Sequence, residues 1–284
     1  MRDTTGRDLR RDITGRHTPM TTGFGFSSFR FAAPALAALA IAACASGPQA
    51  PAKAPALKAA DYAAILSDPG RSDADKKDDA ARKPAEVLDF AQIHPGDTIL
   101  EMEVGRGWYT EILSKAVGPN GKVITQNPAE FGYSAPAMAE RRAAGHLGNV
   151  TDTTSHFDDL KVADGSVDKV LWILGPHELY YVPKGSTGLG DPAKAFSEIS
   201  RVLKPGGEFV VMDHAANAGS PSTTGGTIHR IDPAIVLGLA KDAGFKLEAK
   251  SDVLANPDDD RTKMVFDPTV RRHTDQFLFR FKKG

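Results

Sequence analysis

The chain alternates between two spacings of apolar residues from about residue 60 onwards. Apolar runs of strand length stand at residues 97–103, 122–125, 168–174, 207–213, 246–253 and 276–283. Between them, residues 108–117, 193–203 and 231–245 repeat apolar positions every three or four residues, as an amphipathic helix does. This alternation predicts an α/β domain with a mostly parallel sheet covered by helices on both faces. The last two runs have no long helix between them, which predicts an antiparallel strand at the end of the chain.

The most distinctive segment is ILEMEVGRGWYTEIL, residues 99–113, in which a strand, a glycine turn and a helix follow one another. This is the layout of a nucleotide-binding loop, and ligands in parallel sheets bind at the carboxyl ends of the strands. Glu103 stands where such loops usually carry a glycine. If the backbone needs a positive φ there, a side chain costs about 1 kcal/mol, which a folded domain tolerates.

The charge of Glu103 narrows the class of ligand. A carboxylate inside a phosphate-binding loop would suffer about 4 kcal/mol of repulsion at a separation of about 4 Å and an effective dielectric near 20. The dinucleotide fingerprint also lacks its third glycine, where Thr110 stands, and no acidic residue ends the second strand. The loop therefore disfavours a dinucleotide, and a dinucleotide-dependent oxidoreductase is kept only as a weaker alternative.

Three segments together resemble the class I S-adenosylmethionine (SAM)-dependent methyltransferases. Residues 99–113 are similar to the first motif of that family, residues 163–173 (ADGSVDKVLWI) to its fourth strand, and residues 195–214 (AFSEISRVLKPGGEFVVMDH) to its last helix and fifth strand. The likeness covers roughly residues 84–283. It implies a Rossmann-like fold with seven strands and SAM as the cofactor, whose sulfonium and ammonium groups would be attracted to a glutamate.

Carried over position by position, the resemblance places Glu101 at the acidic position that ends the first strand, with Gly105 and Gly107 as close-approach glycines. The acidic residue that binds ribose hydroxyls in the family is replaced by Gln126 and Asn127, and an amide can bond a hydroxyl without supplying charge. The expected cofactor-binding residues are Glu101, Glu103, Gly105, Gly107, Trp108, Tyr109, Gln126, Asn127, Asp158 and Asp159.

Histidines stand after two of the predicted strands, at the edge where ligands bind. His177 follows the fourth strand, where the methyl group of the cofactor is expected, and is our first choice as base or substrate-positioning residue. Glu178 and Tyr180 are nearby alternates. His214 ends the fifth strand. His229 and Arg230 stand in a loop rich in glycine, serine and threonine that could act as a lid, and Arg230 could hold an anionic substrate group. Each of the four also has a structural interpretation as a locally hydrogen-bonded residue.

Other chemistries have less support. Side chains of metal-ligand type occur at His177, Asp213, His214, His229 and Asp232. The sequence has no H-x-x-x-H or H-E-x-x-H spacing, so no metal is expected. It has no G-x-S-x-G elbow, which disfavours a serine hydrolase. The acidic cluster NPDDDRT, residues 256–262, is interpreted as a solvated turn.

The single cysteine, Cys44, ends an apolar run, FRFAAPALAALAIAAC, at residues 29–44. The run is short for a membrane span but has the length of the hydrophobic region of an export signal. Residues 41–44 (IAAC) resemble the lipobox of bacterial lipoproteins, which implies acylation of Cys44 and durable anchoring if several acyl chains are attached. The alternative is a buried apolar helix with an incidental cysteine.

We therefore expect an export signal at residues 1–44, with Met20 as an alternative start, a flexible tether at residues 45–58 and a methyltransferase-like domain at residues 59–284. The tether prediction rests on the Ala-, Pro- and Lys-rich composition of its residues. The predicted location is the cell envelope, at the periplasmic face of a bacterial membrane, through the lipid anchor.

Composition agrees with one globular domain, since 41% of the 284 residues are hydrophobic and 25% are charged. The net charge of −1 gives no reason to expect nucleic acid as a partner. The sequence thus predicts an exported, SAM-dependent methyltransferase acting on a small molecule or an envelope component. The rival is a non-catalytic envelope binding module on the same fold. It is favoured by the replaced glycine, the missing ribose acid and the cytoplasmic origin of the cofactor.

Overall fold

The computed structural model describes residues 23, 25 and 53–284, and seven strands form one sheet. The strands are β1 (Thr98–Met102), β2 (Lys122–Asn127), β3 (Val150–Thr154), β4 (Val167–Ile173), β5 (Leu203–His214), β6 (Phe245–Ser251) and β7 (Gln276–Lys283). Their order is β3-β2-β1-β4-β5-β7-β6, with β7 antiparallel to β5 and β6 and the other neighbours parallel. This confirms the predicted seven-stranded, mostly parallel sheet with a terminal antiparallel strand.

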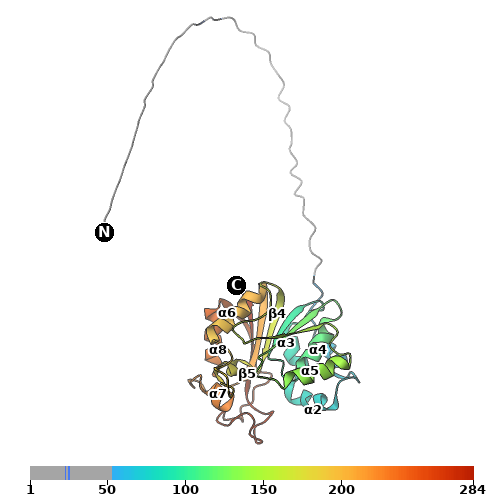
Figure 1. The fold of residues 1–284 in the computed structure, drawn as a ribbon, viewed down its shortest axis with the longest axis vertical. Helices are drawn as coiled ribbons and strands as arrows, with labels where there is room; N and C mark the ends of the chain where they lie inside the picture. The colour runs from blue at the N-terminus through green and yellow to red at the C-terminus, as the bar shows by residue number, and fades with distance from the viewer. Residues whose placement is uncertain (1–22, 24, 26–52) are drawn as a thin grey trace, which may run out of the picture. The chain divides into compact units, whose positions relative to one another are not determined.

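Helices cover both faces of the sheet (Figure 1). They are α1 (Ala59–Leu66), α2 (Asp73–Arg82), α3 (Pro84–Ala91), α4 (Trp108–Val117), α5 (Ser134–Ala143), α6 (Pro192–Val202), α7 (Thr224–Ile228) and α8 (Pro233–Asp242), with the 3-10 helix η1 (Pro176–Tyr180). Successive residues of β1 point to opposite faces, so Ile99 packs in the core with α3 and α4 while Leu100 packs in the core with α6 and α8. Burial on both faces explains why the strands are almost continuously apolar.

The carboxyl ends of β1 and β4 mark the point where the strand order reverses. The chain runs from β1 outward to β2 and β3, then returns to β4 on the other side of β1. In sheets of this topology, the loops that follow two such strands leave in opposite directions, and ligands bind between them. We refer to this region at the ends of β1 and β4 as the crevice. The glycine-containing loop and His177 both lie at this edge of the sheet, as predicted.

β5 begins earlier than the sequence predicts. We expected a strand at residues 207–213 after a Lys-Pro-Gly-Gly turn, whereas the strand spans Leu203–His214. Its register against β4 jumps over residues 204–207, so the predicted turn forms a bulge within the strand. Pro205 fits in this bulge because proline has no N–H to give to a sheet ladder.

The folded unit begins before the predicted boundary at residue 59. Lys53 donates a hydrogen bond of 3.1 Å to Asp168, at the amino end of β4. Residues 53–58, which we predicted as part of a tether, therefore belong to the folded domain. Apart from residues 23 and 25, the predicted export signal lies outside the described residues, and so does Cys44.

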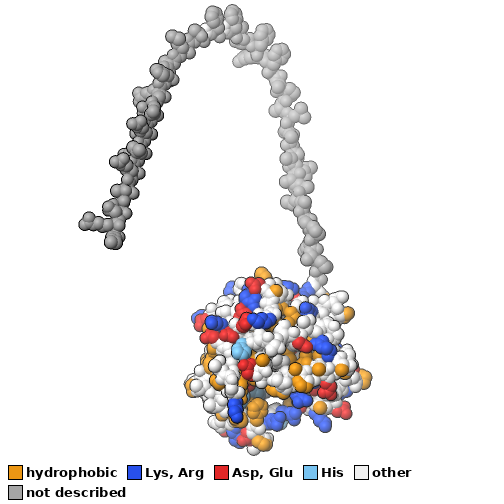
Figure 2. Space-filling view, viewed as in Figure 1, with side chains coloured by type: hydrophobic (Ala, Val, Ile, Leu, Met, Phe, Trp, Pro, Cys, Tyr) orange, Lys and Arg blue, Asp and Glu red, His pale blue; other side chains and the backbone are white. Residues whose placement is uncertain are grey.

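The face of the domain shown in Figure 2 carries acidic and basic side chains that are interspersed with one another. This mixture agrees with the net charge of −1. Within the part of the chain that the structure describes, no helix has both the length and the apolar character needed to cross a bilayer.

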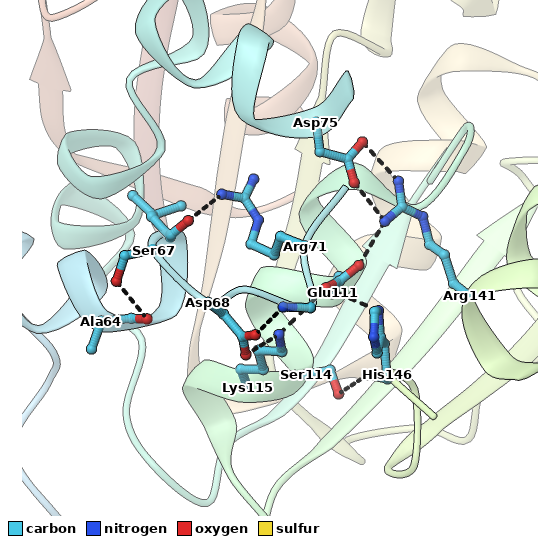
Figure 3. A network of polar contacts seen from close by, with 12 residues as sticks. Ala64, Ser67, Asp68, Arg71, Asp75, Glu111, Ser114, Lys115, Arg141 and His146 are labelled. Atoms are coloured by element: carbon cyan, nitrogen blue, oxygen red, sulfur yellow. Dashed lines mark hydrogen bonds and ion pairs between the residues drawn. The ribbon is translucent and has the colours of Figure 1, made fainter. Parts of the chain in front are cut away.

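A network of ion pairs fastens α2 to α4 and α5 (Figure 3). Arg141 of α5 donates hydrogen bonds of 2.7 and 2.9 Å to Asp75 and one of 2.7 Å to Glu111. Its Nε also donates to the carbonyl oxygen of Arg106, in the loop after β1, at 2.7 Å. Arg141 therefore braces the glycine-containing loop and joins it to the N-terminal helices.

Replacing Arg141 with methionine is expected to lower the free energy of unfolding by about 3 kcal/mol, because buried Glu111 loses its closest cation. Urea unfolding followed by circular dichroism measures this change. Arg142→Met is the matched control, since the side chains of Arg142 and its partner Asp152 are 42% and 48% exposed. Loss of this exposed ion pair should change the free energy of unfolding by less than about 1 kcal/mol. Equal effects in the two variants would contradict the bracing role.

Candidate functional site

The loop after β1 has three residues in the left-handed backbone conformation. Their φ angles are 54° at Glu103, 56° at Gly105 and 78° at Gly107. A Cβ at Gly107 would lie 2.6 Å from the sulfur of Met138 and would also be strained by the positive φ, so glycine is favoured where α5 approaches the loop. The positive φ at residue 103 explains why glycine is usual there, and glutamate accepts it at a cost of about 1 kcal/mol.

The side chain of Glu103 reaches across from β1 to β4. Its carboxylate accepts a hydrogen bond of 3.1 Å from the Trp172 indole N–H, and its backbone N–H donates to the carbonyl oxygen of Gln126 at 2.7 Å. A Cβ at Gly175 would collide with both the Trp172 ring and the Glu103 carboxylate. Burial and the nearby carboxylate of Glu178 raise the pKa of Glu103 well above its ordinary value. Glu103 thus places a carboxyl group in the crevice between the two strands.

Glu101 adds a second carboxyl group at the end of β1. Its side chain is buried, and burial raises its pKa to about 8. Its Oε2 atom has no hydrogen-bond partner among the described residues. A bound cation would satisfy such a group, because it would favour the ionised carboxylate.

The end of β2 offers Asn127, rather than Gln126, to a ligand. The amide of buried Gln126 is engaged on both sides: Oε1 accepts from the N–H of Glu103 at 3.3 Å, and Nε2 donates to the carbonyl oxygen of Ser155 at 2.6 Å. We expected Gln126 to contact the cofactor, but these contacts make it a residue that positions the loop. Asn127 Oδ1 and Ser155 Oγ are buried and have no partner within residues 53–284.

A cavity of about 710 Å³ opens beside Asn127, between the strands β2 and β3 and the helix α5. Its lining is largely apolar and includes Pro128, Phe131 and Met138. Its volume lies in the range of small-molecule sites. The cavity adjoins the strand end at which the family resemblance places the ribose of the cofactor.

On the other side of the crevice, η1 brings His177 to the end of β5. Fully buried Asp213 accepts hydrogen bonds from the backbone N–H of His177 at 2.8 Å and of His214 at 2.7 Å, and its Oδ1 lies 2.7 Å from the Nδ1 of His177. Burial opposes charge on His177, but the carboxylates of Asp213 and Glu178 outweigh it and raise its pKa to about 10. Asp213 therefore fixes the ring of His177, with Nε2 on the side away from that carboxylate.

His177, Glu178 and His229 meet in a three-way contact. The His177 Nε2, the Glu178 Oε1 and the His229 Nδ1 are each 3.2 Å from the other two. Burial would raise the pKa of Glu178, but hydrogen bonds to the two histidines lower it to about 2. The other carboxylate oxygen of Glu178, Oε2, is buried and has no partner in the described part of the chain.

Two glycines of α7 make this contact sterically possible. A Cβ at Gly225 would collide with the carbonyl oxygen of His177, and one at Gly226 would collide with that of Tyr180. The helix α7 therefore lies directly against η1 and ends at His229, which has a left-handed φ of 55°. A non-glycine residue strained in this way, among titratable groups, is typical of functional sites.

Three of the four predicted catalytic residues thus come together. The ring centroid of His177 lies 6.1 Å from that of His214 and 5.2 Å from that of His229. Burial and the charge of His177 lower the pKa of His214 well below its ordinary value, and its Nδ1 lies 2.7 Å from the Oγ1 of Thr274. His214 therefore supports the cluster as a neutral ring.

Arg230 is a structural residue, which corrects our expectation that it holds a substrate group. It is fully buried, and its guanidinium donates hydrogen bonds of 2.8 and 3.1 Å to Asp259. Asp259 belongs to the segment at residues 256–262 that we predicted as a solvated turn, yet it is also buried. The ion pair fastens the loop after β5 to the segment that precedes β7.

Trp108 faces the N-terminal helix α2. The indole N–H of Trp108 donates to the carbonyl oxygen of Asp75 at 3.0 Å, and Arg82 lies over its ring at 4.7 Å. Tyr109 is buried with its ring edge-on to Trp108 at 4.6 Å. The expected contact of Trp108 with the cofactor is therefore replaced by packing against α2. The hydroxyl of Tyr109 is buried without a partner among the described residues.

Asp158 and Asp159 also have local partners. Asp158 accepts a hydrogen bond of 3.0 Å from the backbone N–H of Asp191, and Asp159 pairs with Lys161 on the surface at 2.5 Å. Both contacts stabilise the loop after β3. We had expected both residues to bind the adenine end of the cofactor, and these partners give them a structural role instead.

Sequence reasoning missed Trp172 and gave Glu178 and Asp213 only minor places. A signal for Asp213 was present, because a single acidic residue at the carboxyl end of an apolar strand lies at the ligand-binding edge. Trp172 carries no comparable signal, since it reads as one more apolar strand residue until its indole N–H is seen to meet Glu103.

The crevice suits a cation that also carries hydroxyl groups. Glu101 and Glu103 supply two carboxyl groups, and Asn127 supplies a buried acceptor without a partner among the described residues. SAM presents an ammonium group, a sulfonium group and ribose hydroxyls. The residues present therefore fit this cofactor.

Residues 100–211 match the family model described as a methyltransferase domain. The ubiquinone/menaquinone biosynthesis C-methyltransferase of Hydrogenovibrio crunogenus is 29% identical over 129 residues, which are 45% of this chain and 46% of that protein. The enzyme of the same name from Salmonella arizonae is 26% identical over 183 residues, which are 63% of this chain and 68% of that protein. The match thus spans about half the length of the first relative and about two thirds of the second.

Solved structures show the same architecture. A SAM-dependent methyltransferase from Aquifex aeolicus has a TM-score of 0.53 and 21% identity, with 80% of this chain and 100% of that chain covered. Geranyl diphosphate methyltransferase in complex with SAM has a TM-score of 0.53 and 18% identity, with 81% of this chain and 98% of that chain covered. The chain therefore has the same fold as these class I methyltransferases, and its residues 100–211 match the model of a methyltransferase domain.

Proposed function

We propose that the chain is a SAM-dependent methyltransferase that acts on a small molecule or a component of the cell envelope. The observation that carries this proposal is the pair of carboxyl groups of Glu101, at the end of β1, and Glu103, on the loop that follows it. A positively charged cofactor would stabilise both groups in their ionised form. The methyltransferase domain at residues 100–211 and the shared fold support the same function.

Each part of the crevice has a role in this proposal. Glu101 and Glu103 would hold the ammonium and sulfonium groups, Asn127 would bond a ribose hydroxyl, and Gly105 and Gly107 would let the backbone approach closely. When bound, the cofactor supplies a methyl group on a positively charged sulfur. The protein must then bring an acceptor atom into line with that group and exclude competing water.

In this proposal, the cluster of His177, Glu178 and His229 receives the acceptor. It lies near Glu103, since Glu178 and His177 both act on the pKa of that residue. Ring nitrogens and an ionised carboxylate can hold a hydroxyl, amine or thiol group. The hydrogen bonds that Asp213 accepts keep His177 in one orientation, which favours a fixed position for the acceptor.

Isothermal titration of the purified full-length chain tests this function. We expect SAM to bind, and its demethylated product, S-adenosylhomocysteine, to bind more weakly because it lacks the sulfonium charge. Reduced nicotinamide dinucleotide should not bind, since its pyrophosphate would meet Glu103. A failure to bind SAM at millimolar concentration would remove the basis of the proposal.

The affinity for SAM is expected to rise with pH. Because the pKa of Glu101 is raised to about 8, the free site holds a proton at neutral pH that a bound cation displaces. Below about pH 8, the release of the Glu101 proton should contribute up to about tenfold per pH unit to the association constant, and Glu103, whose pKa is also raised, should add to this slope. Glu101→Gln should bind more weakly, with a flatter profile. Equal slopes in the two proteins would show that Glu101 does not face the cofactor.

One observation favours the rival function, a non-catalytic envelope binding module. The carboxylate of Glu103 accepts a hydrogen bond from the indole N–H of Trp172 across the crevice, at the place where the cofactor would lie. If this contact excludes the cofactor, removal of the Glu103 side chain should open the site. Replacement of this residue therefore separates the two functions.

We also propose that Cys44 is acylated and anchors the chain at the periplasmic face of a bacterial membrane. The support is the IAAC sequence at the end of the apolar run. Cys44→Ala should move the chain from the membrane fraction to the soluble fraction of lysed cells, measured by immunoblotting. A variant that remains in the membrane fraction would contradict acylation of Cys44 as the anchor.

A further inference from the structure

We propose that His177, Glu178 and His229 form a binding site for a zinc-class divalent metal ion. Their three ligand atoms, Nε2, Oε1 and Nδ1, are separated by 3.2 Å in every pair. An ion at the centre of a regular tetrahedron with edges of that length lies about 2.0 Å from each corner, which is the bond length of zinc to nitrogen or oxygen. The three atoms therefore have the spacing of one face of a zinc coordination tetrahedron.

The identity of the three residues fits the same ion. Two histidines and one glutamate form a ligand set that catalytic zinc sites use, with a fourth position left for water or a substrate atom. Within the described residues the group has three members, so the fourth corner of the tetrahedron is available. Nitrogen ligands favour zinc and its transition-metal neighbours over magnesium and calcium, which prefer oxygen.

Asp213 supplies the outer contact that a metal-binding histidine usually has. Its Oδ1 lies 2.7 Å from the Nδ1 of His177, on the side of the ring opposite to the proposed ion. A carboxylate in this position fixes the orientation of the ring and directs Nε2 toward a metal. Asp213 is itself held by two backbone N–H groups, so the histidine is oriented before any ion binds.

Hydrogen bonds alone satisfy the three-way contact incompletely. An imidazole N–H points in one direction in the plane of the ring, so the Nε2–H of His177 cannot be well aligned with both His229 and Glu178. The Oε2 of Glu178 also lies buried without a partner in the described part of the chain. An ion between the three atoms would be coordinated by all of them and would neutralise the carboxylate.

The sequence led us to expect no metal. A site of this kind escapes sequence motifs because its ligands come from separate segments of the chain. Glu178 and His229 are 51 residues apart and come from η1 and from the end of α7. Two adjacent ligands on a 3-10 helix and one after a short helix do not produce the helical spacing of common zinc motifs. The close packing of Gly225 and Gly226 against η1 brings the ligands together.

The test uses the full-length protein, stripped of metal with a chelator, and titration with Zn²⁺ alone by calorimetry. We expect one equivalent to bind with submicromolar affinity, and Mg²⁺ not to compete. Co²⁺ in place of Zn²⁺ should give the visible absorption of a tetrahedral site. Absence of stoichiometric Zn²⁺ binding would overturn the proposal.

Two variants and a control locate the ion. His229→Asn removes one ligand while keeping a residue that tolerates a positive φ, and should weaken Zn²⁺ binding by at least about 100-fold. Glu178→Gln removes the charge of the second ligand and serves if the first variant fails to fold. His273→Asn, at an exposed histidine, should bind as the parent does. Equal binding in His229→Asn and this control would place the ion elsewhere and overturn the site.

Zinc binding is measured without the cofactor, so it is independent of the proposed methyl transfer. Titration of the same metal-free samples with SAM separates the two proposals. Binding of SAM without binding of Zn²⁺ would overturn the metal site alone. Binding of Zn²⁺ without binding of SAM would support the metal site and leave the methyltransferase proposal without its basis.

Discussion

Replacing Glu103 with glycine is expected to weaken SAM binding by at least about tenfold, while the affinity for S-adenosylhomocysteine changes little. The reason is charge, because the carboxylate lies in the crevice beside Trp172 and only SAM brings a sulfonium there. A pair of opposite charges about 4 Å apart attracts by about 4 kcal/mol at an effective dielectric of 20, and desolvation offsets part of this. The part of this attraction that desolvation does not offset is lost in Glu103→Gly. Calorimetric titration of both ligands measures the difference directly.

The opposite result would support the rival function. If the Glu103 side chain closes the site, glycine should tighten the binding of both ligands, since removal of an obstruction does not discriminate by charge. Gln92→Gly is the matched control because Gln92, at the end of α3, has the same φ of 54°. Both variants relieve about 1 kcal/mol of backbone strain, but only one removes a carboxylate from the crevice. Altered SAM affinity in Gln92→Gly would mean that strain, and not charge, controls binding.

The architecture can be predicted from the sequence because burial acts on whole segments. A parallel sheet covered on both faces requires nearly continuous apolar strands, and the helices between them must keep one apolar face. Those patterns are local, so β1 and β4 and the helix α4 could be placed to within a few residues. The register jump in β5 could not, because it depends on how residues 204–207 meet the neighbouring strand.

The site is predictable only as far as the carboxyl ends of strands determine it. His177 and His214 follow apolar strands and therefore had to lie at the ligand-binding edge. The partners of buried polar groups are a different matter, because they come from distant segments. Gln126 looks like a ligand for a ribose until its amide is seen to be engaged by Glu103 and Ser155. Trp108 looks available until α2 is seen to lie against it.

The partner of Arg230 also comes from a distant segment and could not be predicted from the sequence. Replacement of Arg230 has the second large expected effect. Arg230→Met is expected to lower the free energy of unfolding by about 3–5 kcal/mol, because it leaves Asp259 as a buried charge without its cation. The guanidinium makes two hydrogen bonds to Asp259 and donates to the carbonyl oxygens of Ala215 at 3.1 Å and Lys263 at 2.8 Å. Typical domains are stable by about 5–15 kcal/mol, so this loss is a large fraction of the total.

Urea unfolding measures the effect, and two further variants interpret it. Arg261→Met is the matched control, since the side chain of Arg261 is 37% exposed in its ion pair with Asp275 and should contribute less than about 1 kcal/mol. Arg230→Met combined with Asp259→Leu should recover part of the loss, because no buried charge is then left unpaired. A loss in Arg230→Met no larger than in the control would contradict the structural role. Arg230 would then return to the residues that could bind an anionic substrate, since its charge would not be needed to hold the loop after β5 in place.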